Sequence, residues 1–136
     1  MDQSIVDTYN NESDALIAQY ESKTFEEVHS FAVQFIPPTV SLVLDVGSGS
    51  GRDAAWFASK GHRVFAIDPA RQLLHKAQQR HPWHNILWME DSLPNLDKTK
   101  ALCLNFDLIW LSAVWMHLPI SDREEAFSNL GSMMSE

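Results

Sequence analysis

Three glycines at alternate positions follow an acid in Asp45-Val46-Gly47-Ser48-Gly49-Ser50-Gly51. Glycine permits a positive φ in a tight turn and lets a ligand approach the backbone, because no Cβ stands in the way. The residues after the turn, 53–60, predict a short helix that ends at Gly61. The free N–H groups at a helix N-terminus favour an anionic or polar ligand. The segment therefore predicts a binding turn, and the alternative is a purely structural turn.

The glycine spacing differs from the dinucleotide fingerprint G-x-G-x-x-G. The third glycine, Gly51, comes one place early, and Arg52 occupies the position where the fingerprint has glycine. A nicotinamide-dependent dehydrogenase is therefore kept only as an alternative function.

Acids close three of the predicted strands, at Asp45, Asp68 and Asp91. In a doubly wound sheet, ligands bind at the carboxyl ends of the strands, where the strand order reverses. A carboxylate accepts two hydrogen bonds and so suits a pair of ribose hydroxyls, and Asp68 follows the glycines at about the expected separation. The alternatives are that Asp68 caps a helix before Pro69, and that Asp91 is a solvated acid beside a binding Glu90.

Strands and helices alternate in the pattern that must position these acids. The predicted strands are residues 40–46, 62–68, 85–91 and 106–112. Helices are predicted from Pro69 and from the capping box Ser121–Glu124, the latter with Ala126, Phe127, Leu130, Met133 and Met134 available for burial. Residues 92–104 predict a loop with a helical turn. This alternation predicts an α/β fold with βαβ units and a doubly wound parallel sheet.

The residues before the first strand predict helices. Thr24 and Glu27 have the spacing of a capping box, and Phe25, Val28, Ala32 and Phe35 follow at helical intervals. Pro37-Pro38 ends this helix.

The pattern Asp-x-Gly-x-Gly-x-Gly resembles motif I of the class I S-adenosylmethionine-dependent methyltransferases, and the resemblance covers most of residues 40–134. It implies a Rossmann-like fold and S-adenosylmethionine as cofactor. Asp45 would then lie near the cofactor's amino group, and Gly47, Gly49 and Gly51 would let the backbone pass close to it. The resemblance also implies that Asp68 binds the ribose of the cofactor. Asp91 and Ser92 would contact the adenine, and Leu111 and Ser112 would line the methionine portion.

Arg52-Asp53 and the N-terminal tyrosines resemble a small-molecule subgroup of that family. The resemblance implies a helical lid over residues 1–38, carrying Tyr9 and Tyr20 over the cofactor, and a Rossmann-like domain over residues 39–136. Arg52 would face the cofactor's carboxylate. The alternatives are a surface arginine and plain amphipathic-helix packing of the tyrosines.

Methyl transfer is an in-line displacement in which the protein mostly supplies proximity and orientation. His117, after the last predicted strand, is the best candidate for a general base, because imidazole titrates near neutral pH. The alternative is a histidine that packs the connector. Trp115 is a candidate wall of an acceptor pocket. The histidines considered, His62, His75, His81, His84 and His117, are dispersed and predict no metal site.

The composition and net charge of the chain limit the classes of partner that it can bind. The net charge of −8 argues against a nucleic-acid backbone as the main partner. No apolar run is long enough for a membrane span, and the N-terminus does not resemble a signal peptide. With Cys103 as the only cysteine, these features predict a cytoplasmic protein with a small-molecule acceptor.

The sequence stops after the helix that follows the fourth predicted strand, whereas the family normally continues with three further strands. The fourth strand would then be an apolar edge. A fragment, a homodimer through that edge and a compact variant are the three explanations. The sequence thus predicts a small-molecule methyltransferase, with a non-catalytic S-adenosylmethionine- or S-adenosylhomocysteine-binding module or a methyltransferase fragment as the alternative.

Overall fold

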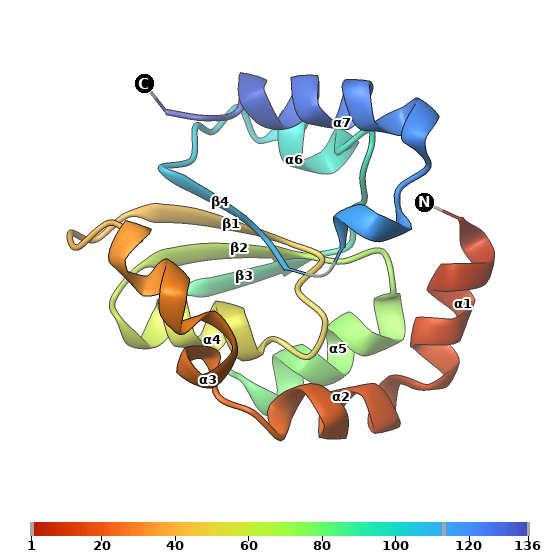
Figure 1. Ribbon diagram of the computed structural model, residues 1–136, viewed down its shortest axis with the longest axis horizontal. Helices are drawn as coiled ribbons and strands as arrows, with labels where there is room; N and C mark the ends of the chain where they lie inside the picture. Colours follow the sequence, from red (N-terminus) through yellow and green to blue (C-terminus); the bar gives the residue numbers. More distant parts are fainter. Residues whose placement is uncertain (1, 113, 136) are drawn as a thin grey trace.

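The computed structural model describes residues 2–112 and 114–135. In this part of the chain, parallel strands form one sheet in the order β3-β2-β1-β4 (Figure 1). The strands are β1 (Leu42–Val46), β2 (Arg63–Ile67), β3 (Ile86–Met89) and β4 (Leu108–Leu111). The order reverses at β1, which lies between β2 and β4, so a crevice opens beyond the carboxyl end of β1. The predicted doubly wound α/β fold is confirmed.

Helices cover both faces of the sheet. Helices α4 (Arg52–Ser59) and α5 (Arg71–Arg80) lie on one face, and α6 (Asp97–Ala101) and α7 (Ile120–Ser132) lie on the other (Figure 1). One apolar cluster joins β1 and β2 to α4, and a second joins the opposite side of β1 to α7. Burial on both faces explains why the strands read as nearly continuous apolar runs.

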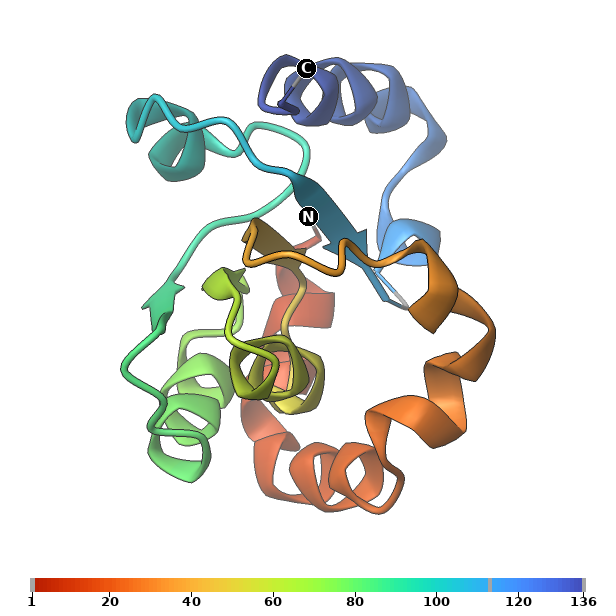
Figure 2. The same cartoon turned by 90° about the vertical axis from the view of Figure 1, so that its left-hand side faces the viewer.

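The N-terminal segment consists of α1 (Gln3–Asn11), α2 (Ser13–Glu21), α3 (Phe25–His29) and the 3-10 helix η1 (Ser30–Phe35). In Figure 2 these red and orange helices follow one another in an arc that starts beside α5. Val6 of α1 and Ile17 of α2 share an apolar cluster with Leu73 of α5. Phe25 of α3 stacks on Trp56 of α4, with ring centroids 4.0 Å apart. The segment is therefore held against both helices of one face.

The capping box at Thr24 is confirmed. Its side chain accepts the Glu27 N–H at 3.1 Å, and the Glu27 carboxylate accepts the Thr24 N–H at 3.3 Å. The expected single helix through Phe35 is wrong, because α3 ends at His29 and a 3-10 helix follows, which leaves Phe35 exposed.

Two predicted helix starts are wrong. Helix α5 begins at Arg71 and not at Pro69, because the Asp68 carboxylate accepts the Ala70 N–H at 2.8 Å and holds the chain in a turn before the helix. Helix α7 begins at Ile120, directly after Pro119, so Ser121 lies inside the helix and caps nothing. This register buries Ala126, Leu130 and Met133 but leaves Phe127 and Met134 exposed, contrary to the sequence prediction.

The remaining elements agree with the prediction apart from their ends. All four strands are shorter than expected, and the loop at 92–104 contains the expected helical turn as α6. Strand β4 is an edge of the sheet, as predicted, and each of its residues is only half-buried.

Candidate functional site

A cavity of about 370 Å³ lies at the carboxyl ends of β1, β2 and β4, between the glycine turn and the N-terminal helices. Its volume is in the range of small-molecule and cofactor sites. The wall has one part from the N-terminal segment, one from the turn after β1 and one from the ends of β2 and β4. The residues discussed below that line it are Tyr9, Tyr20, Gly47, Gly49, Arg52, Asp53, Asp68, Ser112, Val114 and His117.

The glycine turn has a backbone that other residues rarely adopt. Gly47 and Gly49 have φ values of +73° and +56°. The N–H groups of Gly47 and Ser48 both donate to the Ile67 carbonyl, at 2.8 and 2.9 Å, which ties the turn to the end of β2. A Cβ on Gly47 would come within 2.8 Å of Val114, whereas a Cβ on Gly49 would meet only the Tyr20 ring at 3.8 Å. The turn therefore presents bare backbone to the cavity at Gly49.

Asp68 lies on the cavity wall and is held by backbone donors. Its Oδ2 accepts the Gly49 N–H at 3.0 Å, and its Oδ1 accepts the Ala70 N–H at 2.8 Å. Burial raises the pKa of Asp68 to about 6, although these two N–H groups act in the opposite direction. Each oxygen keeps a further lone pair, so the carboxylate can still accept hydrogen bonds from a ligand.

Asp45 lies behind the turn and not on the cavity wall. It is almost fully buried, and its Oδ2 has no hydrogen-bond partner among the described residues. Burial, and then the nearby Asp53 and Asp68, raise the pKa of Asp45 well above its usual value, while Arg52 opposes them. Three buried acids thus surround the turn with one guanidinium among them, an electrostatic setting that favours a cationic ligand.

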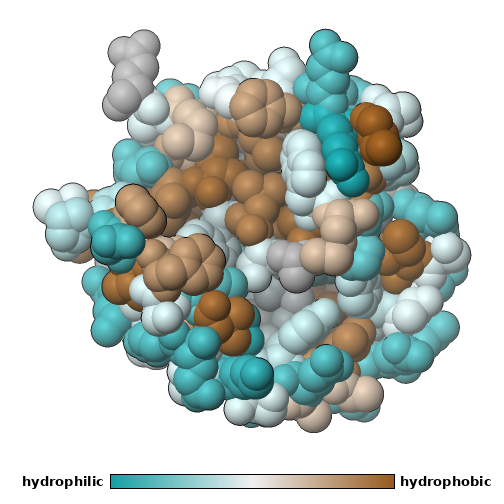
Figure 3. All heavy atoms as spheres, in the orientation of Figure 1, coloured by the Kyte–Doolittle hydropathy of each residue, from teal (hydrophilic) through white to brown (hydrophobic). Residues whose placement is uncertain are grey.

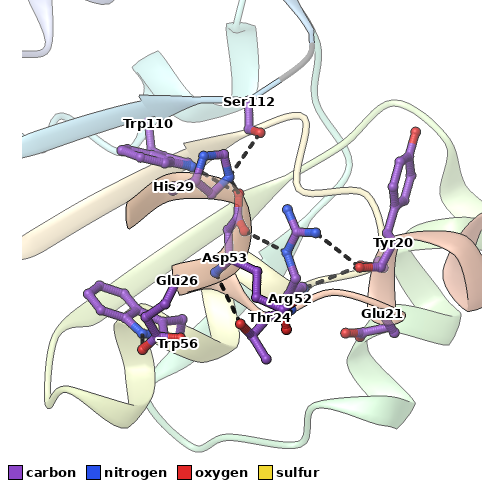
Figure 4. A network of polar contacts seen from close by, with 12 residues as sticks. Tyr20, Glu21, Thr24, Glu26, His29, Arg52, Asp53, Trp56, Trp110 and Ser112 are labelled. Carbon is purple, nitrogen blue, oxygen red and sulfur yellow. Dashed lines mark hydrogen bonds and ion pairs between the residues drawn. The ribbon is translucent and has the colours of Figure 1, made fainter. Parts of the chain in front are cut away.

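Arg52 lies on the wall, with its guanidinium fixed at two points. Its Nε donates to Asp53 Oδ1 at 3.0 Å, and its Nη1 donates to the Tyr20 carbonyl at 3.0 Å (Figure 4). These two contacts hold the Arg52 guanidinium in place instead of leaving it free in solvent. The remaining N–H groups of the guanidinium are available to an anion.

Tyr9 and His117, which are far apart in the sequence, meet across the cavity. The Tyr9 hydroxyl lies 2.7 Å from His117 Nε2, and the two rings pack edge to face. His117 ends the 3-10 helix η2 (Trp115–His117), so this contact joins α1 to the connector after β4. Burial, followed by the nearby Tyr20 and Asp68, raises the pKa of Tyr9. The hydroxyl therefore stays protonated and can donate to the imidazole.

Several predicted residues do not reach this cavity. Gly51 caps α4, and a Cβ there would come within 2.7 Å of Trp88, so its glycine serves packing. Leu111 and Trp115 pack against the apolar cluster on the α7 side and do not line this cavity.

Asp91 and Ser92 line a second, smaller cavity of about 10 Å³, which shares Gly47, Pro69 and Val114 with the first. The Asp91 carboxylate also has a structural role, because its Oδ2 accepts both the N–H and the hydroxyl of Thr99, at 2.8 and 2.7 Å. The solvated acid considered as an alternative does not describe it.

Asp53 lines the cavity and His29 contacts the Asp53 carboxylate, and the sequence analysis assigned a role to neither side chain. His29 lies on α3 with its Nε2 3.2 Å from Asp53 Oδ2 and 3.4 Å from the Ser112 hydroxyl (Figure 4). A signal was present, since His29 follows Phe25 by four residues after a capping box and so shares its buried helix face.

No group of three or more histidine, cysteine, aspartate or glutamate side chains within residues 2–112 and 114–135 is arranged to hold a metal ion. In the same part of the chain, no helix has the length and apolar character needed to cross a bilayer.

Structural comparison finds methyltransferases with the same fold. An S-adenosylmethionine-dependent TehB-like methyltransferase from Corynebacterium glutamicum is 21% identical over 98% of this chain and 68% of its own, with a TM-score of 0.69. Magnesium protoporphyrin IX methyltransferase from Synechocystis, with bound S-adenosylhomocysteine, is 20% identical over 98% and 68%, with a TM-score of 0.73. Phosphoethanolamine N-methyltransferase 1 from Haemonchus contortus is 20% identical over 97% and 28%, with a TM-score of 0.72.

No curated protein matches the chain significantly. The sequence profile of the family described as "Methyltransferase domain" does match, over residues 43–136. This match spans the sheet, the glycine turn and all the helices after β1. The chain therefore belongs to the methyltransferase domain family.

Proposed function

We propose that this chain binds S-adenosylmethionine in the cavity and catalyses transfer of its methyl group to a small-molecule acceptor. The observation that supports this most is the meeting of Gly49 and Asp68 at one cavity wall, joined by a 3.0 Å hydrogen bond. Bare backbone and a hydroxyl-accepting carboxylate are what an adenosyl ligand requires. The acids around the turn suit the positive charges of the cofactor.

The residues on the wall fit the parts of this cofactor. Asp68 accepts the ribose hydroxyls, and the remaining N–H groups of Arg52 bind the carboxylate of the methionine portion. Asp91 and Ser92 are the proposed partners of the adenine; the smaller cavity that they line, about 10 Å³, holds no more than one water molecule, so the adenine must widen it on binding. Asp45 lies behind the wall, next to the position proposed for the amino group, and does not itself line the cavity.

Bound S-adenosylmethionine supplies an activated methyl group, so the chain's own residues mainly hold the reactants in line. His117 accepts the proton that the acceptor loses. In the structure its Nε2 is engaged by Tyr9, so the Tyr9 phenol oxygen is the atom that meets the acceptor and passes the proton on to His117.

The cavity volume and its closure by α1 and α2 support a small-molecule acceptor. The solved relatives include enzymes for a porphyrin and for phosphoethanolamine. The net charge of −8 disfavours nucleic acid, and the single cysteine supports a cytoplasmic location.

Calorimetry with S-adenosylmethionine, S-adenosylhomocysteine and NAD tests the cofactor. We expect the first two to bind and NAD not to, and a preference for NAD would overturn the proposal. Asp68→Ala should weaken binding by about 1–3 kcal/mol, since a buried hydrogen-bonding partner is lost. Unchanged affinity would remove Asp68 from the site.

Methyl transfer from labelled cofactor to a panel of small acceptors tests catalysis. His117→Ala and Tyr9→Phe should both lower turnover while leaving cofactor affinity nearly intact. Tight cofactor binding without transfer to any acceptor would favour the non-catalytic binding module.

We also propose that the chain forms a homodimer through the edge of β4. In Figure 3, apolar side chains gather on the face over β4 and β1. An apolar edge strand with unpaired backbone groups tends to pair with another chain.

A further inference from the structure

The Asp53 carboxylate is the point at which four elements of the site meet. Its Oδ1 accepts from Arg52 Nε at 3.0 Å, and its Oδ2 accepts from Trp110 Nε1 of β4 at 3.0 Å. His29 Nε2 of α3 is also 3.2 Å from Oδ2. Through Arg52, whose Nη1 donates to the Tyr20 carbonyl, the network extends to the end of α2 (Figure 4). One buried carboxylate therefore connects two N-terminal helices, α4 and β4.

The geometry requires a carboxylate at position 53. Both oxygens receive N–H donors, so an amide in either orientation would point an NH₂ group at another donor. The side chain is 8% exposed, and water cannot readily replace a lost partner. The position therefore requires a group that only accepts hydrogen bonds. Arg52 and His29 are among the donors that this group accepts from.

His29 is set to hold the network and not to attack a substrate. The same ring nitrogen, Nε2, faces both Asp53 Oδ2 and the Ser112 hydroxyl. A catalytic Ser-His-Asp relay uses opposite nitrogens of the ring, so this arrangement is not one. Because Nε2 faces a carboxylate, it carries a hydrogen and donates it. The ring is further fixed edge to face on Trp110 and tilted against Phe25.

We propose that Asp53 and His29 are positioning residues that make the aim of the Arg52 guanidinium into the cavity depend on the docking of α3. When α3 lies against α4, His29 and Trp110 fix Asp53, and Asp53 fixes the Nε edge of Arg52. The opposite edge of the guanidinium then faces the ligand. His29 touches no ligand itself, yet it controls affinity for the amino-acid end of the cofactor. This proposal rests on the proposed function, in which Arg52 binds the cofactor's carboxylate.

The test compares two ligands that differ only at that end. S-adenosylhomocysteine carries the amino-acid portion, and 5′-methylthioadenosine lacks it. Dissociation constants for both are measured by calorimetry for the wild type, Asp53→Asn, His29→Leu and His29→Gln. We expect Asp53→Asn and His29→Leu to weaken S-adenosylhomocysteine about tenfold, in keeping with a lost hydrogen bond to a charged group, and to leave 5′-methylthioadenosine unchanged. His29→Gln, which keeps an N–H donor, should recover part of the affinity.

Glu26→Gln is the matched control. Glu26 also joins α3 to α4, because it accepts from Trp56 Nε1 at 2.6 Å, and the substitution removes the same charge. Neither Glu26 nor Trp56 lines the cavity, so both ligands should bind this variant like the wild type.

Equal weakening of both ligands by Asp53→Asn and His29→Leu would overturn the proposal, since it would mean that the network only supports the fold. Unchanged affinity for S-adenosylhomocysteine in the folded histidine variants would overturn it as well. Circular dichroism establishes the folding of each variant, and His29→Leu decides the matter if Asp53→Asn does not fold. A wild type that binds neither ligand would instead refute the proposed function.

Discussion

At the scale of single residues, the buried carboxyl of Asp68 lies on the cavity wall, and its burial lowers the stability of the folded protein at neutral pH. Burial raises its pKa from 3.8 to about 6, so the folded protein holds this proton more tightly than the unfolded chain does. The stability that this tighter proton binding contributes is fully present below the pKa of the unfolded chain. It is lost as the pH rises through the pKa of the folded protein. At about 1.4 kcal/mol per unit, the loss is about 3 kcal/mol.

Asp68→Asn should therefore remove a pH-dependent loss of stability. We expect the free energy of unfolding of the variant, minus that of the wild type, to increase between about pH 4 and pH 6.5. Urea denaturation across this range without ligand measures it. If the free energy of unfolding changed with pH in the same way for both proteins, the pKa of Asp68 would not be raised.

Gly51 and Gly131 give opposite predictions for the same change to alanine. At Gly51, φ is +85° and the new Cβ would lie 2.7 Å from Trp88, so we expect a loss of at least about 1–2 kcal/mol. At Gly131, inside α7, a Cβ meets nothing within 4 Å, and we expect a gain of about 0.5–1 kcal/mol. Thermal unfolding of both variants and of the wild type measures these changes in stability. A neutral Gly51→Ala would contradict the packing described for the turn.

At the scale of elements, α3 depends on its cap. Thr24→Ala removes a capping-box acceptor and should cost about 0.5–2 kcal/mol. Because α3 is only five residues long, the effect should appear locally. Hydrogen exchange should accelerate in residues 25–35 and not in α7. Uniformly faster exchange would mean that α3 unfolds only with the whole domain.

The sequence was sufficient for the order and type of the elements but not for their ends. Apolar runs closed by Asp45 and Asp68 identified strands, because burial on both faces leaves a composition that is hard to mistake. Helix starts at Pro69 and Ser121 were wrong because other local contacts set the first turn of each helix. Asp68 holds the Ala70 N–H, and Pro119 already starts α7.

The candidate site was partly predictable for a similar reason. Asp68 and Gly49 lie on the wall because strand ends converge at one edge of a parallel sheet, which topology alone dictates. The contact of Tyr9 with His117 and that of His29 with Asp53 depend on how the N-terminal helices dock, and no local pattern specifies this. Leu111 was misplaced because its side chain faces the α7 side of the sheet.

At the scale of the whole molecule, the open edge of β4 makes the oligomeric state testable. The Asp107 N–H donates to the Leu42 carbonyl of β1 at 2.8 Å. The register pairs Val43 with Leu108 and Leu44 with Ile109, and the odd-numbered residues of β1 bond to β2, so the Leu108 N–H also faces β1 and the Ile109 N–H points away from it. Ile109→Pro should thus remove an edge donor and weaken the proposed dimer without removing a donor of the pairing to β1.

Light scattering after size exclusion, over a hundredfold range of concentration, measures this dimer. A wild type that stays monomeric at the highest concentration would refute it. Equal dimerisation of a folded Ile109→Pro variant would show that the dimer interface lies elsewhere.

The shared cluster of Val6 and Ile17 with Leu73 has a consequence for how the protein is made. Within this chain, helices α1 and α2 are synthesised before α5, the helix on which their apolar faces pack. Their apolar side chains therefore stay exposed while β1, α4 and β2 are synthesised. Helices α1 and α2 thus settle only after α5 has been made, and the ligand cavity is complete only when Ser112 and His117, which are synthesised later, join its wall.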